Sequence, residues 1–192
     1  MSNVTVARWE HHLRFRARTG TDIEIELDGA GEEGTVKPLE LVLTALCGCT
    51  GMDVISICRK KRQNVTTYSV GATGEQRDEH PRSYESIVVE HRISGETLDD
   101  VAVARAIQLS ASRYCPVSAH LSSGNTRISH RYAIEDERGA RSAEVLVTGP
   151  FGAGLEQGSG PAEIRRPAEI QAPAEVQAPA ATPGKDRSAG PM

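Results

Sequence analysis

Apolar and polar residues alternate along several short stretches of the chain, which is the pattern of strands with one buried face. In the clearest case Ile23, Ile25 and Leu27 fall on one face, with polar residues between them. Strands are therefore predicted at 4–11, 13–18, 22–27, 65–76, 84–94 and 126–134.

Two longer segments have the spacing of helices. The first begins at Pro38, a residue suited to the first helical position, and runs to about Arg62. It is apolar around most of its circumference, which predicts a central helix covered on several sides. The second spans 98–114, is amphipathic, and follows a capping pair of Thr97 and Asp100. Pro116 interrupts it, and a short helix to residue 122 comes next.

The order of these elements predicts an α+β domain with antiparallel sheets around a long buried helix. Composition changes near residue 139, so the domain is assigned to residues 1–138. Residues 139–192 are rich in proline, alanine and glutamate, and prolines recur every six positions from 161 to 179. Such a segment is predicted to be a disordered tail, and an adaptor role that recruits a partner through it is the weakest of three functional hypotheses.

Charge and composition exclude several classes of protein. The net charge of −4 gives no general attraction to nucleic acid, and four cysteines are too few for a disulfide scaffold. The longest apolar run is interrupted by Thr44, Gly48 and Asp53, so no association with a membrane is expected. The first residues lack the pattern of a secretory signal. These features predict a cytoplasmic protein with reduced thiols.

Two cysteines lie in distinctive helical settings. Cys49 is inside the apolar helix, and Cys115 stands where the second helix breaks before Pro116. An attacking thiol beside a resolving one would fit this arrangement, so thiol redox chemistry is the first hypothesis. Simple core packing is the alternative for each thiol. A metal site of Cys47, Cys49, Cys115 and a histidine ranks lower, because neither paired Cys-x-x-Cys spacing nor clustered histidines are present, and no metal is expected.

The segment PLELVLTALCGCT at 38–50 and the segment LSASRYCPV at 109–117 resemble the two cysteine motifs of the OsmC/Ohr family. The resemblance covers about residues 5–135 and implies the OsmC-like fold. It also implies an intertwined homodimer with active sites at the subunit interface. Characterised members are thiol peroxidases that reduce small organic or inorganic hydroperoxides in the response to oxidative stress.

The resemblance further assigns roles to residues. Cys49 would attack the peroxide and become a sulfenic acid, and Cys115 would resolve it to a disulfide. An external dithiol would then reduce the disulfide, with no other cofactor. Arg16 or Arg18 is the candidate to hold the thiolate, and Glu40 is a candidate to orient that arginine.

Two departures from the family pattern leave an alternative open. The family's peroxidases carry an acid directly after the proline, where this chain has Leu39, with Glu40 next. The activating arginine has no unambiguous match, and Arg16 and Arg18 are candidates by region only. The alternative is a non-catalytic OsmC-like protein that binds a small apolar ligand at the dimer interface.

Overall fold

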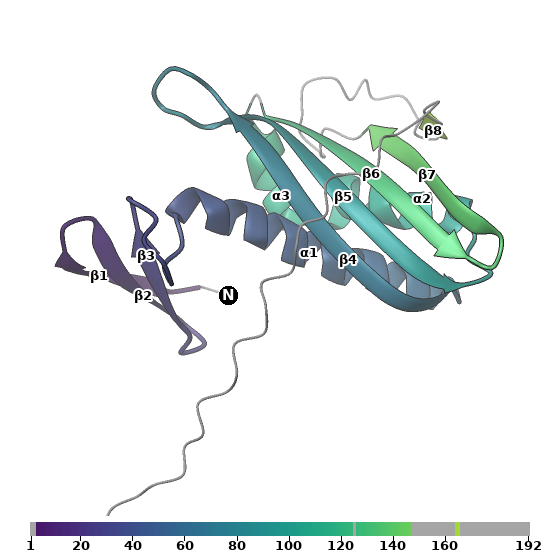
Figure 1. Cartoon of the computed structure of the whole chain (residues 1–192), viewed down its shortest axis with the longest axis horizontal. Coiled ribbons are helices and arrows are strands. Elements are labelled where there is room, and N and C mark those ends of the chain that lie inside the picture. Colours follow the sequence, from purple (N-terminus) through teal and green to yellow (C-terminus); the bar gives the residue numbers. More distant parts are fainter. Residues whose placement is uncertain (1–2, 125, 147–163, 166–192) are drawn as a thin grey trace, which may run out of the picture.

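The structure, a computed structural model, describes residues 3–124, 126–146 and 164–165 (Figure 1). It confirms the α+β class and the order of the predicted elements. The helices are α1 (Pro38–Lys60), α2 (Asp100–Leu109), the π-helix η1 (Ser110–Tyr114) and α3 (Pro116–Ser122). The strands are β1 (Thr5–His11), β2 (Arg14–Thr19), β3 (Glu24–Asp28), β4 (Asn64–Gln76), β5 (Tyr84–Glu96), β6 (Arg127–Asp136), β7 (Gly139–Leu146) and β8 (Ile164–Arg165).

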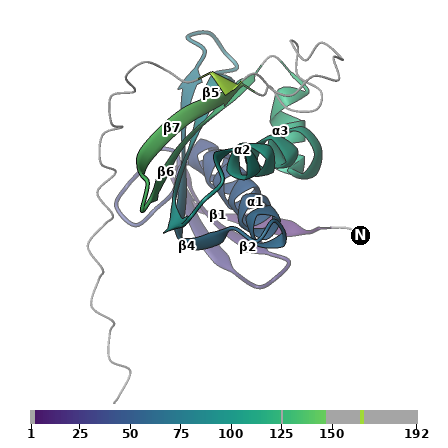
Figure 2. The same ribbon diagram turned by 90° about the vertical axis from the view of Figure 1, so that its right-hand side faces the viewer.

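The strands form two separate sheets. β1, β2 and β3 make a small antiparallel sheet beyond the N-terminal end of α1 (Figure 1). β4 to β8 make a five-stranded sheet in sequence order, and the helices cover one of its faces (Figure 2). β5 and β6 run parallel, which corrects the expectation of purely antiparallel sheets. The crossover through α2, η1 and α3 makes this parallel pairing possible and carries those helices onto the same face as α1.

α1 begins as its sequence predicts but is covered differently. Pro38 occupies the first turn, and the Glu40 carboxylate accepts a hydrogen bond of 3.1 Å from the backbone N–H of Lys37. Leu46 and Val54 are buried on the side of α1 that faces the five-stranded sheet, whereas Met52 is 69% exposed. Within one chain α1 is thus covered on one face only, and the prediction of cover on several sides is not met there.

α1 also corrects the sequence argument about membranes. It has 23 residues, and its most apolar 18-residue stretch has a mean hydropathy of 1.9, so by length and composition it could span a bilayer. Its buried face nevertheless packs on β4 and α2 as a core helix does. Asp53, which interrupts the apolar run, is hydrogen-bonded to Ser110 inside the chain. The interpretation as a core helix therefore rests on packing and not on insufficient length.

The second predicted helix is divided. α2 starts at Asp100 and is capped by the Asp99 carboxylate, which accepts from the Val101 backbone N–H at 2.9 Å. Thr97, predicted as the cap, instead donates to Glu137. After Leu109 the backbone widens into η1, whose last hydrogen bond joins the N–H of Cys115 to the carbonyl of Ser110 at 2.9 Å.

The C-terminal boundary predicted after residue 138 falls too early. β7 begins at Gly139 and pairs with β6 over its full length, and its Ala143 and Val145 belong to the buried core. The two residues Ile164–Arg165 form β8 against β7. The rest of the tail, for which disorder is predicted, lies outside the described residues.

Tyr84 fastens the beginning of α1 to the sheet. Its ring is buried, and its hydroxyl donates to the carbonyl of Leu39 at 3.1 Å. We expect Tyr84→Phe to lower the free energy of unfolding by about 1 kcal/mol, the typical net contribution of one such bond. Urea denaturation measures this change, with Tyr114→Phe as the control because Tyr114 is 52% exposed. Equal stability of Tyr84→Phe and the parent would show that this bond does not hold α1.

Candidate functional site

The two cysteines singled out in the sequence meet inside the helical layer. The sulfur atoms of Cys49 and Cys115 and a carboxylate oxygen of Asp53 all lie within 4.8 Å of one another. Cys49 and Asp53 are one turn apart on the same face of α1, and Cys115 is the residue between η1 and α3. The fold therefore brings the predicted attacking and resolving thiols together.

Hydrogen-bond donors surround both sulfurs. Thr50 Oγ1 donates to Cys115 Sγ at 3.7 Å, and the backbone N–H of Ser118 donates to the same sulfur at 3.3 Å. The backbone N–H of Val117 is directed to the Cys49 sulfur. Cys115 and Thr50 are buried, and Cys49 is half-buried. The positions of both sulfurs are thus fixed by α1 and the first turn of α3.

Asp53 is the site residue that sequence reasoning missed. Ser110 Oγ donates to its Oδ2 at 2.9 Å, so the carboxylate is oriented from the first residue of η1. The signal was available: an acid in an apolar helix, four residues after Cys49, lies on the face of that cysteine. The burial of its partner Ser110 is visible only in the structure.

The electrostatics of the site oppose a free thiolate within one chain. Burial, the hydrogen bond with Cys115, and the charges of Cys115 and Asp53 raise the pKa of Cys49 to about 12, against a smaller opposing effect of the Val117 N–H. None of the ion pairs among the described residues involves Asp53. Burial is the largest of the effects that raise the pKa of Cys49, so within one chain this thiol stays protonated.

The other predicted site residues lie elsewhere in the chain. Arg16 and Arg18 are on β2 and line a hollow of about 510 Å³ on the small sheet. Arg16 pairs with Glu10 at 2.8 Å, and Arg18 pairs with Asp22 at 2.6 Å. Glu40 is exposed at the start of α1, where it caps the helix. Within one chain, the fold does not bring these three residues to the cysteines.

The remaining thiols are not at the site. Cys58 is buried in the core cluster and Cys47 is half-buried, and burial raises the pKa of both, that of Cys58 to about 11. Neither belongs to the group formed by Cys49 and Cys115. This agrees with core packing for Cys58, whereas Cys47 lies outside both core clusters, and the group of possible metal ligands contains Asp53 and not Cys47.

Two histidines that no sequence pattern connects form a buried chain with a tyrosine. Tyr68 Oη is 2.8 Å from His91 Nδ1, and His91 Nε2 is 3.0 Å from His130 Nδ1. His130 Nε2 has no hydrogen-bond partner among the described residues. Both histidines are almost fully buried, and burial lowers the pKa of each, that of His130 to about 4. Interior strand positions thus hold neutral histidines.

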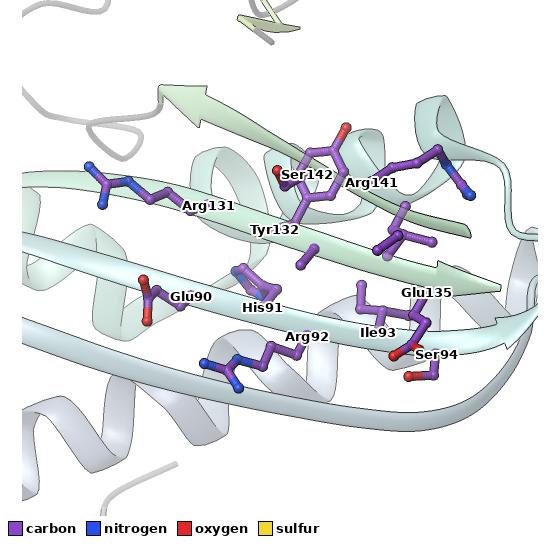
Figure 3. A pocket seen from close by; sticks show the side chains of 13 residues that line it. Glu90, His91, Arg92, Ile93, Ser94, Arg131, Tyr132, Glu135, Arg141 and Ser142 are labelled. Carbon is purple, nitrogen blue, oxygen red and sulfur yellow. The ribbon is translucent and has the colours of Figure 1, made fainter. Parts of the chain in front are cut away.

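A shallow groove of about 440 Å³ lies on the five-stranded sheet, away from the cysteines (Figure 3). It runs over β5, β6 and β7, and its outward-pointing side chains include Glu90, Arg131 and Glu135. None of its lining residues belongs to the thiol site. This groove and the hollow on the small sheet are therefore both separate from the reactive thiols.

Comparison with known proteins identifies the family. Residues 29–131 match the family model described as OsmC-like protein. Protein YhfA of Escherichia coli K12 is 37% identical over 127 residues, 66% of this chain and 94% of that protein. A crystal structure of a hypothetical protein from Aquifex aeolicus VF5 is 28% identical, with a TM-score of 0.62 over 71% of this chain and 98% of that one.

The fold is shared more widely than the sequence. A crystal structure of an organic hydroperoxide resistance protein OsmC from Legionella pneumophila has a TM-score of 0.53, covering 70% of this chain and 96% of that chain. Its 13% identity limits the likeness to the fold. The family match, which spans Cys49 and Cys115, together with these structural neighbours shows that the chain belongs to the OsmC-like family.

Proposed function

We propose that the protein is a thiol peroxidase that reduces small organic or inorganic hydroperoxides in the cytoplasm. The observation that carries the proposal is the approach of the Cys49 and Cys115 sulfurs within 4.8 Å, from distant parts of the sequence. The name of the Legionella pneumophila neighbour, an organic hydroperoxide resistance protein, supports the same chemistry.

The proposed reaction uses the two thiols in turn. The Cys49 sulfur attacks one peroxide oxygen, the O–O bond breaks, and the released alkoxide or hydroxide takes up the thiol proton to leave as an alcohol or water. Cys49 becomes a sulfenic acid. The Cys115 sulfur then displaces its hydroxyl as water and forms a disulfide. An external dithiol returns both thiols to the reduced state, so neither a cofactor nor a metal is required.

The raised pKa of Cys49 means that a positive charge must reach the site for this reaction to be fast. We assign that role to Arg16 or Arg18 of a second subunit, with Glu40 to orient the guanidinium. In one chain both arginines lie on the small sheet and hold acids of that sheet. On dimer formation one of these arginines would leave its acid on the small sheet. It would then pair with the Cys49 thiolate of the other subunit.

Exposed apolar surface supports a homodimer. Only 22% of the most apolar part of α1 is buried in one chain, and Met52 projects from it. Val6 and Trp9 on β1 are likewise more than half exposed. Large apolar surfaces of this kind are normally covered by a partner. A second copy that packs against α1 would cover them and place the thiols at the subunit interface.

We expect Met52→Gln to raise the Kd of the dimer about tenfold. An amide buried without partners at an interface costs about 1–3 kcal/mol, and 1.4 kcal/mol corresponds to a factor of ten. Sedimentation velocity over a dilution series measures this shift. Val101→Gln on α2 is the control, since Val101 has a similar exposure of 66%. An unchanged Kd for Met52→Gln would place the interface elsewhere.

One experiment tests the proposed chemistry directly. The reduced, chelator-treated protein receives one equivalent of cumene hydroperoxide, and mass spectrometry after digestion locates any disulfide. Rapid formation of a bond between Cys49 and Cys115 is expected. Slow or scattered oxidation over all four thiols would contradict the proposal.

That negative result would favour the second candidate, a non-catalytic member that binds a small apolar ligand at the dimer interface. The observation in its favour is the raised pKa of Cys49, which leaves the thiol protonated in one chain. Co-purification of an apolar compound with the dimer, with thiols that react no faster than free cysteine, would support it.

A further inference from the structure

Three side chains of the thiol site have the composition of a metal site. We propose that Cys49, Asp53 and Cys115 bind one thiophilic divalent cation, with zinc as the matching ion, and that metal binding and disulfide formation exclude each other. The proposal uses residues of the proposed peroxidase site, but it holds whether or not the protein reduces peroxides.

The donor atoms suit zinc in kind and number. Zinc in proteins is bound by cysteine sulfur and carboxylate oxygen, and sites with three protein ligands keep a fourth position open for water or another ligand. With bonds of about 2.3 Å to sulfur and about 2.1 Å to oxygen, tetrahedral donors lie about 3.5–3.8 Å apart. The three atoms here are within 4.8 Å of one another, so shifts of about 1 Å complete the site.

The neighbours of the three residues hold them for such a role. Ser110 donates to Oδ2 of Asp53, which orients the carboxylate as outer hydrogen-bond partners do in metal sites. Thr50 and the backbone of Ser118 donate to the Cys115 sulfur, and donors of this kind stabilise a thiolate ligand. Asp53 and Cys115 therefore each have a hydrogen-bond partner, and Cys49 is held in place by the helix α1.

The charge balance also favours a cation. Two thiolates and a carboxylate carry three negative charges, and a divalent ion reduces the sum to one. No Lys or Arg forms an ion pair with Asp53 in the described part of the chain. An arginine from a second subunit and a metal ion are thus competing sources of the same compensating charge.

The exclusion between metal and disulfide arises from the chemistry of the thiols. Binding of the ion to two thiols releases two protons and changes no oxidation state. Oxidation by a hydroperoxide removes two electrons from the two sulfurs, forms the S–S bond, and yields an alcohol and water from the peroxide and two protons. The disulfide has no thiolate left to bind the ion, so the ion is released.

The test uses the full-length, untagged protein, freed of metal and reduced with a phosphine. Cd²⁺ serves as the probe because its thiolate complexes absorb in the near ultraviolet, whereas histidine-bound ions do not. We expect one Cd²⁺ per chain, displaced by Zn²⁺. Cys49→Ser and Cys115→Ser should lose the absorption band, and Asp53→Asn should weaken binding at least about tenfold.

Matched variants and a second readout make the result decisive. Cys47→Ser removes a neighbouring thiol of the same helix and should bind Cd²⁺ like the parent. Bound Zn²⁺ should protect Cys49, but not Cys47, from alkylation by iodoacetamide, since both of these thiols are partly exposed. If Asp53→Asn misfolds by circular dichroism, Asp53→Glu replaces it and should retain binding.

Binding that survives Cys49→Ser, equal affinity of a folded Asp53→Asn variant, or no binding at micromolar Cd²⁺ would overturn the proposal. The peroxidase test is made on metal-free protein, and the metal titration contains no peroxide. Failure of one is therefore distinguishable from failure of the other.

Discussion

Cys49→Ser is expected to reduce hydroperoxide turnover to the rate measured without protein, because a serine hydroxyl does not form a sulfenic acid. Turnover is followed as loss of cumene hydroperoxide with dithiothreitol as the reductant. Cys115→Ser should behave differently. After removal of dithiothreitol, it should consume one equivalent of peroxide and stop at a sulfenic acid on Cys49, which dimedone traps for mass spectrometry.

The other two thiols provide controls for this result. Cys47→Ser and Cys58→Ser change thiols of the same helix that lie outside the Cys49–Cys115 pair, and both variants should keep the parental turnover if folded. Thermal unfolding checks the fold, since Cys58 is buried in the core. Turnover by Cys49→Ser equal to that of the parent would eliminate the proposed mechanism.

Acidification from pH 7.5 to pH 5 is expected to lower the free energy of unfolding by at least about 2 kcal/mol, through the buried histidine pair. Burial lowers the pKa of His130 from 6.5 to about 4. Between these values the unfolded chain binds a proton that the folded chain does not, so stability falls as the pH falls. The part of the range from pH 6.5 to pH 5 lies between these two pKa values. It spans about 1.5 pH units, and each unit lowers the free energy of unfolding by about 1.36 kcal/mol.

His91 adds to the loss in the same direction, because its pKa is also lowered by burial and by the nearby His130. Carboxylates with lowered pKa values, such as Glu137 with a reference value of 4.5, contribute mainly at lower pH. Urea denaturation at several pH values measures the effect. In a His91→Gln, His130→Gln double variant the loss should nearly vanish, and an unchanged pH dependence would exclude the histidines as its source.

The sequence was sufficient for most of the fold, because hydrophobic periodicity is local. The long helix from Pro38 and the strands at 65–76 and 84–94 were placed within a few residues of their observed ends. β7 was missed because Gly139 and the charged residues around it resemble the beginning of a linker. The burial of its Ala143 and Val145 depends on pairing with β6, which no local pattern reveals.

The site was predictable in part for the same reason. The motifs around Cys49 and Cys115 marked both thiols, and their approach within 4.8 Å fits the expectation, although their roles stay predictions. The contact of Asp53 with Ser110 joins two helices and could not be inferred from either alone. The buried pair of His91 and His130 depends on the parallel register of β5 and β6. Arg16 and Arg18 were placed by region only, and one chain does not bring them to the thiols.

The π-helix η1 makes the site depend on the number of residues between α2 and Pro116. Its wider turn accommodates one more residue than an α-helix over the same length. If the same five residues closed into regular α-helix instead, Cys115 and α3 would be rotated by about 100° around the helix axis. Cys115 would keep its neighbours in the chain but point away from Cys49. A chain one residue shorter between α2 and Pro116 should therefore keep the thiol pair with a regular α-helix, so residue number and π-helix should change together wherever the pair is retained.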